Sequence, residues 1–465
     1  TIEHGVPAWN VADGPVYGNT SQLHQLVSTV LRLVTHDHIL ALLRAFAALW
    51  LTLAAWALGR APEQRGAALV ALLGPVGIAT LTTGMETAMV VGLGALFVAE
   101  WQRAQGERDA VLAALGILLV SARPDMALLV GISLLARVRT RGRLEAPVIW
   151  AVGCAAVVGL CAVVYGSPVP TAFATKSGAT DLYDETFLQL CRDAKLRHFA
   201  LFALSTAPLV GRWRRAHWPL AAATVAFITY HLLGNLDVMG MHARYYAPAL
   251  PWIVAAGAGG SWPKPPVLGL WGLLLAGAMA TGLVPGTQGW PLGQVSPFAY
   301  LALLLAVIAS AYDRAAWAAA ALAAGVVGAP SLGTPWRDDN TLALDLSAQV
   351  TTFRGTDGIV DCLPPDVHVF HSEIGVIGQR LPQATITDLG GLMGPVIPAA
   401  ELDAFCVAQS PDAVFLPHRN YRNAHNALRS GRCLTGYTRV VQRSASPLYI
   451  RNDLMGRWAD CAGTP

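Results

Sequence analysis

The stretch APVIWAVGCAAVVGLCAVVY, residues 146–165, contains no charged side chain. A run of about 20 apolar residues is long enough to cross the hydrocarbon core of a bilayer as a helix. The whole chain is of the same character, because 54% of its 465 residues are hydrophobic and only 13% are charged. The mean hydropathy is +0.46. A soluble domain carries about twice this share of charge, so we expect a bilayer to surround most of the chain.

Apolar segments continue on both sides of this stretch. They predict an α-helical polytopic membrane bundle over 39–331, with about 10–12 spans. The pairs that flank Gly84 and Pro124 are short, and broken helices or re-entrant hairpins are the alternative there. The segments are 39–59, 66–82, 84–100, 109–121, 124–138, 146–165, 198–211, 216–233, 246–261, 267–284, 297–312 and 315–331.

The basic residues predict the orientation of the bundle, because cytoplasmic loops are enriched in Lys and Arg. With the 60–65 loop inside and alternating spans, the outer loops hold six basic residues, four of them in the long loop 166–197. The inner loops hold thirteen: Arg60, Arg65, Arg103, Arg108, Arg137, Arg139, Arg141, Arg143, Arg212, Arg214, Arg215, Lys264 and Arg314. The segment after the last span therefore falls outside the cytoplasm.

The two ends of the chain are less apolar than its middle. Residues 1–38 predict an outer-face loop followed by an amphipathic helix over 22–34 that lies on the membrane surface. The chain opens at Thr1 without an initiator Met, and we expect a preceding segment to be missing. Residues 332–465 predict a small exported α/β domain, with strands in 367–378 and 384–392 and helices near 398–409 and 420–430.

Four cysteines lie in the predicted exported domain: Cys362, Cys406, Cys433 and Cys461. Two disulfides in any of three connectivities are possible, and free buried thiols are the alternative. His371 and Glu373 lie two residues apart on one face of a strand, but a metal site needs further ligands. Packing is the favoured interpretation of this pair. The net charge of +3 gives no indication of nucleic-acid binding.

Ionisable residues gather in the outer loops: Glu86, Arg123, Asp125, Lys176, Asp237, His242 and Arg244. Such residues at membrane ends are costly unless they face water, a partner or a substrate. Arg123, Lys176 and Arg244 are candidates for binding a lipid-linked phosphate, since guanidinium pairs with phosphate through two hydrogen bonds. Asp125, Asp237 and Glu86 are candidates for a general base or for the ligands of a divalent metal.

Each candidate also has a structural interpretation. Asp125 and Arg123 are compatible with a simple ion pair at a helix end, because Pro124 suits a helix start. Glu86 would be favoured in the first turn of a helix by the helix dipole. His242 is compatible with a histidine at the membrane interface, and Arg244 with an anchor beside Tyr245 and Tyr246.

Several of these segments resemble the motifs of one enzyme family in order along the chain. WNVADGPVYGNTSQL (9–23), TGMETAMV (83–90) and SARPDMALL (121–129) resemble its outer-loop elements. YGSPVPTAFATK (165–176), LDVMGMHARYYAPALP (236–251) and GVIGQRLPQATITDLGGLMGP (375–395) follow. The family is that of the terminal β-(1→2)-arabinofuranosyltransferases of bacterial cell envelopes, within the GT-C type of membrane glycosyltransferases.

This resemblance implies a GT-C helical bundle that transfers a sugar, such as arabinofuranose, from a polyprenyl-phosphate donor to a cell-envelope glycan on the outer face of the plasma membrane. It places Glu86, Asp125 and Asp237 at the reaction and Arg123, Lys176 and Arg244 at the donor phosphate. His242, Tyr17 and Asn19 are then candidates for binding the acceptor or the sugar. The expected partners are the lipid-linked donor, the glycan acceptor and membrane lipid.

The chain departs from the GT-C pattern in one important element. An acidic motif in the first outer loop has no counterpart here, since Glu3 and Asp13 lie in other contexts. A motif in a missing upstream segment would restore the pattern. Its true absence would favour a non-catalytic membrane protein of the same fold, associated with the envelope or the flagellar motor. A transporter of lipid-linked sugars is a further alternative, but no internal repeat supports it.

Overall fold

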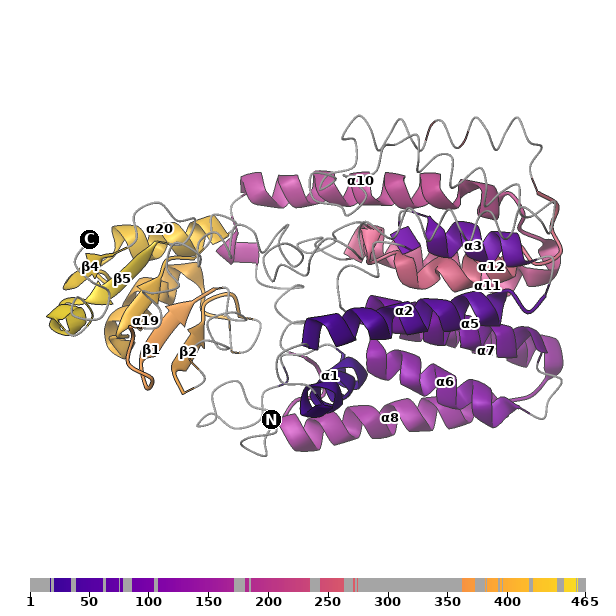
Figure 1. Ribbon diagram of the computed structural model, residues 1–465, viewed down its shortest axis with the longest axis horizontal. Helices are drawn as coiled ribbons and strands as arrows, with labels where there is room; N and C mark the ends of the chain where they lie inside the picture. Colours follow the sequence, from indigo (N-terminus) through magenta and orange to yellow (C-terminus); the bar gives the residue numbers. More distant parts are fainter. Residues whose placement is uncertain are drawn as a thin grey trace. The chain divides into compact units, whose positions relative to one another are not determined.

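The computed structural model of the chain forms two compact units, which are drawn in Figure 1. The helical unit comprises Ser21–Val157 and Arg192–Thr341, and the sheet unit comprises Thr1–Thr20, Val158–Cys191 and Leu342–Pro465. The structure describes residues 17, 21–34, 39–61, 64–74, 76–77, 86–103, 108–170, 180–183, 185–234, 243–262, 271, 274, 362–372, 381, 383–391, 394, 396–417, 421–440, 447–456 and 458. The predicted spans 297–312 and 315–331 fall outside these ranges, as does most of 267–284.

The described part of the helical region contains helices at most of the positions that the apolar segments predict. They are α1 (Gln22–Val34), α2 (Ile39–Leu58), α3 (Arg65–Leu73), α5 (Thr87–Arg103), α6 (Asp109–Ala122), α7 (Met126–Arg141), α8 (Glu145–Tyr165), α10 (Glu185–Val210), α11 (Trp218–Gly234) and α12 (Leu250–Ala256). Short 3-10 turns precede α11 and α12, at Arg215–His217 and Ala247–Ala249. The amphipathic helix expected over 22–34 is present with those bounds.

Two of these helices differ from the expectation. The segment expected over 66–82 is broken, because α3 ends at Leu73 and is followed by Gly74 and Pro75, which terminate helices. In contrast, α10 begins at Glu185 rather than near 198. Residues 185–197, which we expected to belong to the outer loop 166–197, are therefore helical.

Helix α5 forms the centre of the helical unit and is buried along most of its length. It packs against α2, α6 and α12, as expected of a helix that is apolar on all sides. Two glycines allow the close contacts. A Cβ at Gly92 would lie 2.4 Å from the ring of Trp50 in α2, and a Cβ at Gly94 would lie 2.7 Å from the ring of Trp252 in α12.

Helix α8 has the features of a membrane span. It is the one helix among the described residues that is long and apolar enough to cross a bilayer. Little of it is buried, and large apolar side chains such as Val152, Leu160 and Val163 are 64–84% exposed. A contiguous apolar surface of this kind needs a nonpolar environment. Shorter apolar helices at Ala45–Leu58, Asp109–Ala122, Trp218–Gly234 and Ala247–Ala256 accompany it, so the described residues support 10–12 spans only in part.

The sheet unit contains a five-stranded mixed sheet in the order β2-β1-β3-β5-β4. Strands β2, β1 and β3 are parallel, and β5 runs antiparallel to both β3 and β4. The predicted strand and helix regions are occupied by β1, β2, α19 and α20, whereas β3, β4 and β5 were not predicted. The bounds are β1 His368–His371, β2 Thr385–Asp388, α19 Ala399–Gln409, β3 Ala413–Phe415, α20 Arg422–Ser430, β4 Tyr437–Arg439 and β5 Leu448–Arg451.

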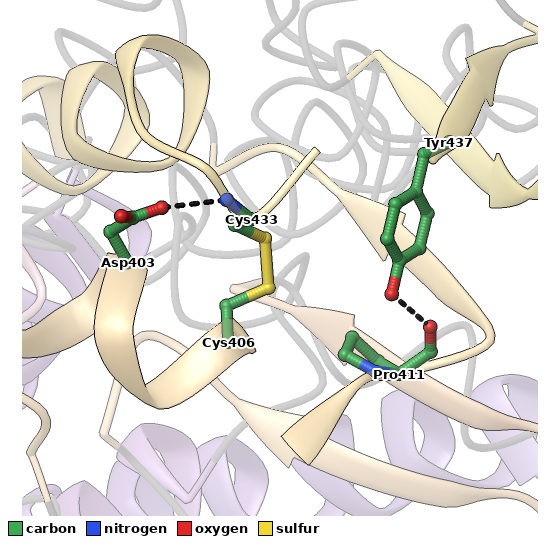
Figure 2. The surroundings of a disulfide bond; sticks show 5 residues. All are labelled: Asp403, Cys406, Pro411, Cys433 and Tyr437. Atoms are coloured by element: carbon green, nitrogen blue, oxygen red, sulfur yellow. Dashed lines mark hydrogen bonds between the residues drawn. A yellow bond between two sulfur atoms is a disulfide. The ribbon is translucent and has the colours of Figure 1, made fainter. Parts of the chain in front are cut away.

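A disulfide joins Cys406 of α19 to Cys433, which follows α20 (Figure 2). The carboxylate of Asp403 accepts a hydrogen bond of 2.7 Å from the backbone N–H of Cys433, which holds the same two segments together. Figure 2 also shows the hydroxyl of Tyr437 donating to the carbonyl of Pro411. Cys362 is disulfide-bonded as well, while Cys461 lies outside the described residues. The free-thiol alternative is therefore wrong for Cys362, Cys406 and Cys433.

The turn at 180–183 packs against α20 within the sheet unit. The amide of Asn423 donates hydrogen bonds to the carbonyls of Asp181 and Tyr183, at 2.9 and 2.7 Å. The rings of Tyr183 and Tyr421 stack with their centroids 5.1 Å apart. These contacts explain why part of the region between α8 and α10 belongs to the same compact unit as the sheet.

Candidate functional site

The turn between α6 and α7 brings two of the predicted residues together. Helix α6 ends at Ala122 and α7 begins at Met126, so Pro124 lies in the turn between the two helices with Arg123 and Asp125 on either side. A proline suits this place because it cannot continue α6. The guanidinium of Arg123 donates from Nε to Asp125 Oδ1 at 3.1 Å and from Nη2 to Oδ2. Both side chains are about 90% buried. The predicted ion pair is therefore present, in the two-bond geometry that arginine favours.

Asp125 is not a simple helix cap. It occupies the N-cap position of α7, where an aspartate usually accepts a hydrogen bond from the next turn, but its side chain makes no such bond. Its Oδ2 instead lies 2.9 Å from Nε2 of His231 in α11, which is 106 residues further along the chain. The carboxylate thus joins two helices and holds a buried imidazole.

His231 is the principal residue of this cluster that the sequence did not predict. It is 3% exposed and lies between Phe227 and Tyr245, whose ring stacks on the imidazole with a centroid distance of 5.6 Å. The signal that could have identified it is an ionisable side chain inside the apolar segment 216–233. Such residues inside a span are costly and usually have a partner or a function.

A second arginine approaches the same aromatic ring. The guanidinium of Arg244 lies 5.1 Å from the centroid of Tyr245, and that of Arg123 lies 5.8 Å from it. Arg244 is only 6% exposed. The next residue, Tyr246, is buried against Phe199 and Phe202. Arg244 is therefore inside the unit, where the expected alternative of an interfacial anchor does not apply.

The backbone before Arg244 is in an unusual conformation. Ala243 has φ 61°, in the left-handed region that residues other than glycine rarely adopt, and it is fully buried. Strained backbone of this kind persists only where the surrounding structure enforces it, and it is common at functional sites. The backbone conformation of Ala243 determines the direction in which the side chain of Arg244 projects from the chain.

Glu86 completes the part of the cluster that the structure describes. It lies directly before α5, is half-buried, and interacts electrostatically with Arg123. It also lies near His24 in the amphipathic helix α1. Burial lowers the pKa of His24, and the negative charge of Glu86 opposes that shift. Glu86 is thus placed where the dipole of α5 favours an acid and where it also faces a buried arginine.

Four of the nine predicted site residues meet in one cluster, which we define as Glu86, Arg123, Asp125, His231, Arg244 and Tyr245. We call it the outer-end cluster after the orientation that the basic loops predict. Tyr17 belongs to the sheet unit, where its ring stacks on Tyr165 at 4.7 Å. The remaining predicted residues, Asn19, Lys176, Asp237 and His242, lie outside the described residues. Their roles stay predictions.

The cluster has the composition needed to bind a phosphate and to move a proton. Two buried guanidiniums provide planar donors for phosphate oxygens, and a carboxylate–imidazole pair is a common arrangement for general-base catalysis. Among the described residues, no group of three or more His, Cys, Asp or Glu side chains could hold a metal ion. The predicted divalent metal therefore gains no support from this part of the chain.

The chain consists of a helical bundle and a smaller α/β unit, and this combination is shared with a protein of known structure. This likeness is to a solved structure, the crystal structure of ArnT from Cupriavidus metallidurans bound to undecaprenyl phosphate. The TM-score is 0.54 over 94% of this chain and 88% of that one. The sequences are 14% identical, so the comparison shows the fold alone. No protein-family profile and no curated protein sequence matches the chain, and the resemblance to arabinofuranosyltransferases stays a prediction.

Proposed function

We propose that this chain is a membrane glycosyltransferase that transfers a sugar from a polyprenyl-phosphate donor to an acceptor hydroxyl. The observation that carries the proposal is the meeting of Arg123, Arg244 and the Asp125–His231 pair in one buried cluster. The GT-C type fold agrees with it, and the solved protein of this fold was bound to undecaprenyl phosphate.

The proposed reaction divides the cluster into two parts. Arg123 and Arg244 bind the donor phosphate and stabilise the charge that it gains as the bond to the anomeric carbon breaks. The acceptor oxygen forms the new bond to that carbon, and its proton passes to His231. Asp125 holds the imidazole by the 2.9 Å contact and stabilises its protonated form, as the carboxylate does in other carboxylate–histidine pairs.

Glu86, Lys176 and Asp237 have roles that follow from the sequence resemblance. Lys176 would add a third cation to the donor phosphate, and Asp237 and Glu86 are further candidates for the base. Tyr17, Asn19 and His242 are candidates for binding the sugar or acceptor. The same resemblance supports arabinofuranose as the sugar and a cell-envelope glycan as the acceptor. It also supports a bacterial plasma-membrane location with the sheet unit on the outer face.

The test is sugar transfer by the full-length protein in proteoliposomes that contain a radiolabelled polyprenyl-phosphate sugar. Arg244→Ala and Asp237→Asn should each abolish transfer. Arg215→Ala removes an exposed arginine that lies outside the cluster and should leave transfer unchanged. Full activity in both the Arg244→Ala and the Asp237→Asn protein would contradict the proposal. Donor binding without any turnover by the unmodified protein would instead identify a non-catalytic member of the fold.

A further inference from the structure

A cavity of about 760 Å³ opens at the opposite end of the helical unit from the outer-end cluster. Helix α7 connects the two places, since Arg123 and Asp125 precede it whereas Arg137 and Thr140 lie in its last turns. At 1.5 Å per residue, the backbones of Arg123 and Arg137 are about 20 Å apart along the helix. The cavity is therefore separate from the proposed reaction site.

The described lining of this cavity is basic. Its ionisable side chains are Arg60, Arg103, Arg137 and His217, and no carboxylate is among the described residues that line it. Gln64 and Gln102 supply amide groups and lie 3.4 Å apart. Asp109 neutralises Arg137 from outside the lining, through a contact of 2.6 Å. The amide of Gln64 donates to Gln102, and the amide of Gln102 donates to the carbonyl of Ala255 at 3.2 Å. Arg60 and Arg103 are therefore the groups that would attract an anion.

A structural explanation of these arginines is that they neutralise the carbonyl ends of the surrounding helices. Arg65 and Arg212 act in this way, donating to the carbonyls of Gly59 and Gly260 at 3.0 to 3.2 Å. Within the described part of the chain, Arg60 and Arg103 donate to no such carbonyl. Arg60 lies 3.5 Å above the ring of Trp56, and Arg103 makes a long 3.7 Å contact with Glu100.

The surroundings of the cavity have the character of a membrane surface. Trp218 lines the cavity and is 49% exposed. Trp56, whose ring lies below the guanidinium of Arg60, is 55% exposed. Exposed tryptophans at helix ends are typical of the membrane–water interface. The basic loops predict that this end of the bundle faces the cytoplasm. Basic pockets between helices on that side commonly bind the head groups of anionic lipids.

We propose that this cavity binds the phosphate group of an anionic phospholipid from the cytoplasmic leaflet. A cavity of about 760 Å³ is far larger than a free phosphate ion and accommodates a whole head group. The proposal rests on the chain spanning a membrane with the predicted orientation. It does not depend on the transfer reaction at the outer-end cluster.

Native mass spectrometry of the full-length protein in micelles of phosphatidylcholine and phosphatidylglycerol tests this proposal. The double variant Arg60→Gln/Arg103→Gln should bind phosphatidylglycerol about 30-fold more weakly, since each arginine near an anionic surface contributes about fivefold. Arg65→Gln/Arg143→Gln removes the same charge from inner loops outside the lining and should bind like the unmodified protein. Phosphatidylcholine binding should be equal in all three proteins.

A second variant protects the test against misfolding. Thr140→Glu places a carboxylate on the exposed rim of the cavity without removing an arginine, and it should also weaken phosphatidylglycerol binding. Undiminished binding by a folded Arg60→Gln/Arg103→Gln protein would overturn the proposal. Displacement of the lipid by an equal concentration of inorganic phosphate would overturn it too, because the cavity would then bind the free ion. Sugar transfer in pure phosphatidylcholine should be the same in all variants, which separates this result from the proposed function.

Discussion

Two buried arginine–aspartate pairs lie at opposite ends of α7, and their surroundings differ. Asp109 and Arg137 join the start of α6 to the end of α7 through a 2.6 Å contact, with side chains only 2–3% exposed. Arg123 and Asp125 are neighbours in the turn before α7, and they share their site with His231, Arg244, Tyr245 and Glu86. In the first pair the two charges neutralise each other, and their contact connects two helices. The second contains more ionisable groups than neutralisation requires.

This difference separates a structural ion pair from a candidate reaction site. A buried pair by itself is weak evidence of stabilisation, because desolvation offsets much of the attraction. Additional buried ionisable groups raise that cost further, and they persist where a substrate or reaction uses them. Variants of the two pairs should therefore have different effects. Changes at Arg123–Asp125 should lower activity, and changes at Asp109–Arg137 should lower stability.

The largest effect is expected from His231→Gln. Glutamine can still donate a hydrogen bond to Asp125 but cannot accept a proton at pH 7, so transfer should fall by about 10²–10⁴. The measurement is kcat for sugar transfer by the full-length protein, with thermal unfolding to verify that the variant is folded. Activity within threefold of the unmodified protein would remove His231 from the proposed mechanism.

Asp125→Asn should have a slightly smaller effect of about 10²–10³ on kcat, because the amide cannot stabilise a protonated imidazole. The KM for the donor should change little. A comparable loss in both parameters for Asp125→Asn would assign this residue to donor binding instead. The separate effects on kcat and KM distinguish a positioning residue from a merely structural one.

Asp109→Asn is the matched change at the inner pair. It leaves the buried charge of Arg137 without its counter-ion and should destabilise the helical unit by about 3 kcal/mol. Transfer per folded molecule should remain as in the unmodified protein. Denaturant titration in detergent measures the first quantity and active-site titration the second. A large loss of kcat in the folded fraction would contradict the interpretation of Asp109–Arg137 as a purely structural pair.

The smallest effect concerns a second buried histidine, His371 in β1, which stacks on Phe415 with centroids 4.5 Å apart. Burial lowers the pKa of His371 to about 3. Between about pH 3 and 6.5 the unfolded state binds a proton that the folded state does not. The stability of the sheet unit should therefore decline as pH falls below 6.5, with a slope of at most about 1.4 kcal/mol per unit.

His371→Phe keeps a ring against Phe415 and removes the titrating group. Hydrogen exchange of β1 and β3 in the full-length protein, measured at pH 7 and at pH 5, should show a larger pH dependence in the unmodified protein than in this variant. Equal dependence in both would show that other groups determine the acid sensitivity. Unlike His231, this histidine should have no effect on transfer at neutral pH.

The sequence by itself determined the apolar helices, the amphipathic helix over 22–34 and two of the five strands. These features depend on the composition and periodicity of short segments, and the local pattern of hydrophobic residues reveals both. It also indicated that Glu86, Arg123, Asp125 and Arg244 belong together, because consecutive spans return charged residues to the same side. The end of α3 and the start of α10 were missed, since apolar runs do not reveal where helices begin and end.

Only the tertiary structure decided which distant groups meet. His231 contacts Asp125 across 106 residues, Arg137 contacts Asp109 across 28, and Cys406 is bonded to Cys433. Strands β3 and β4 have only three residues each and are too short to produce a clear alternation. They and β5 become a sheet only through pairing with one another and with β1. Such contacts depend on how helices and strands pack in space, and a linear pattern of apolar and polar residues does not contain that information.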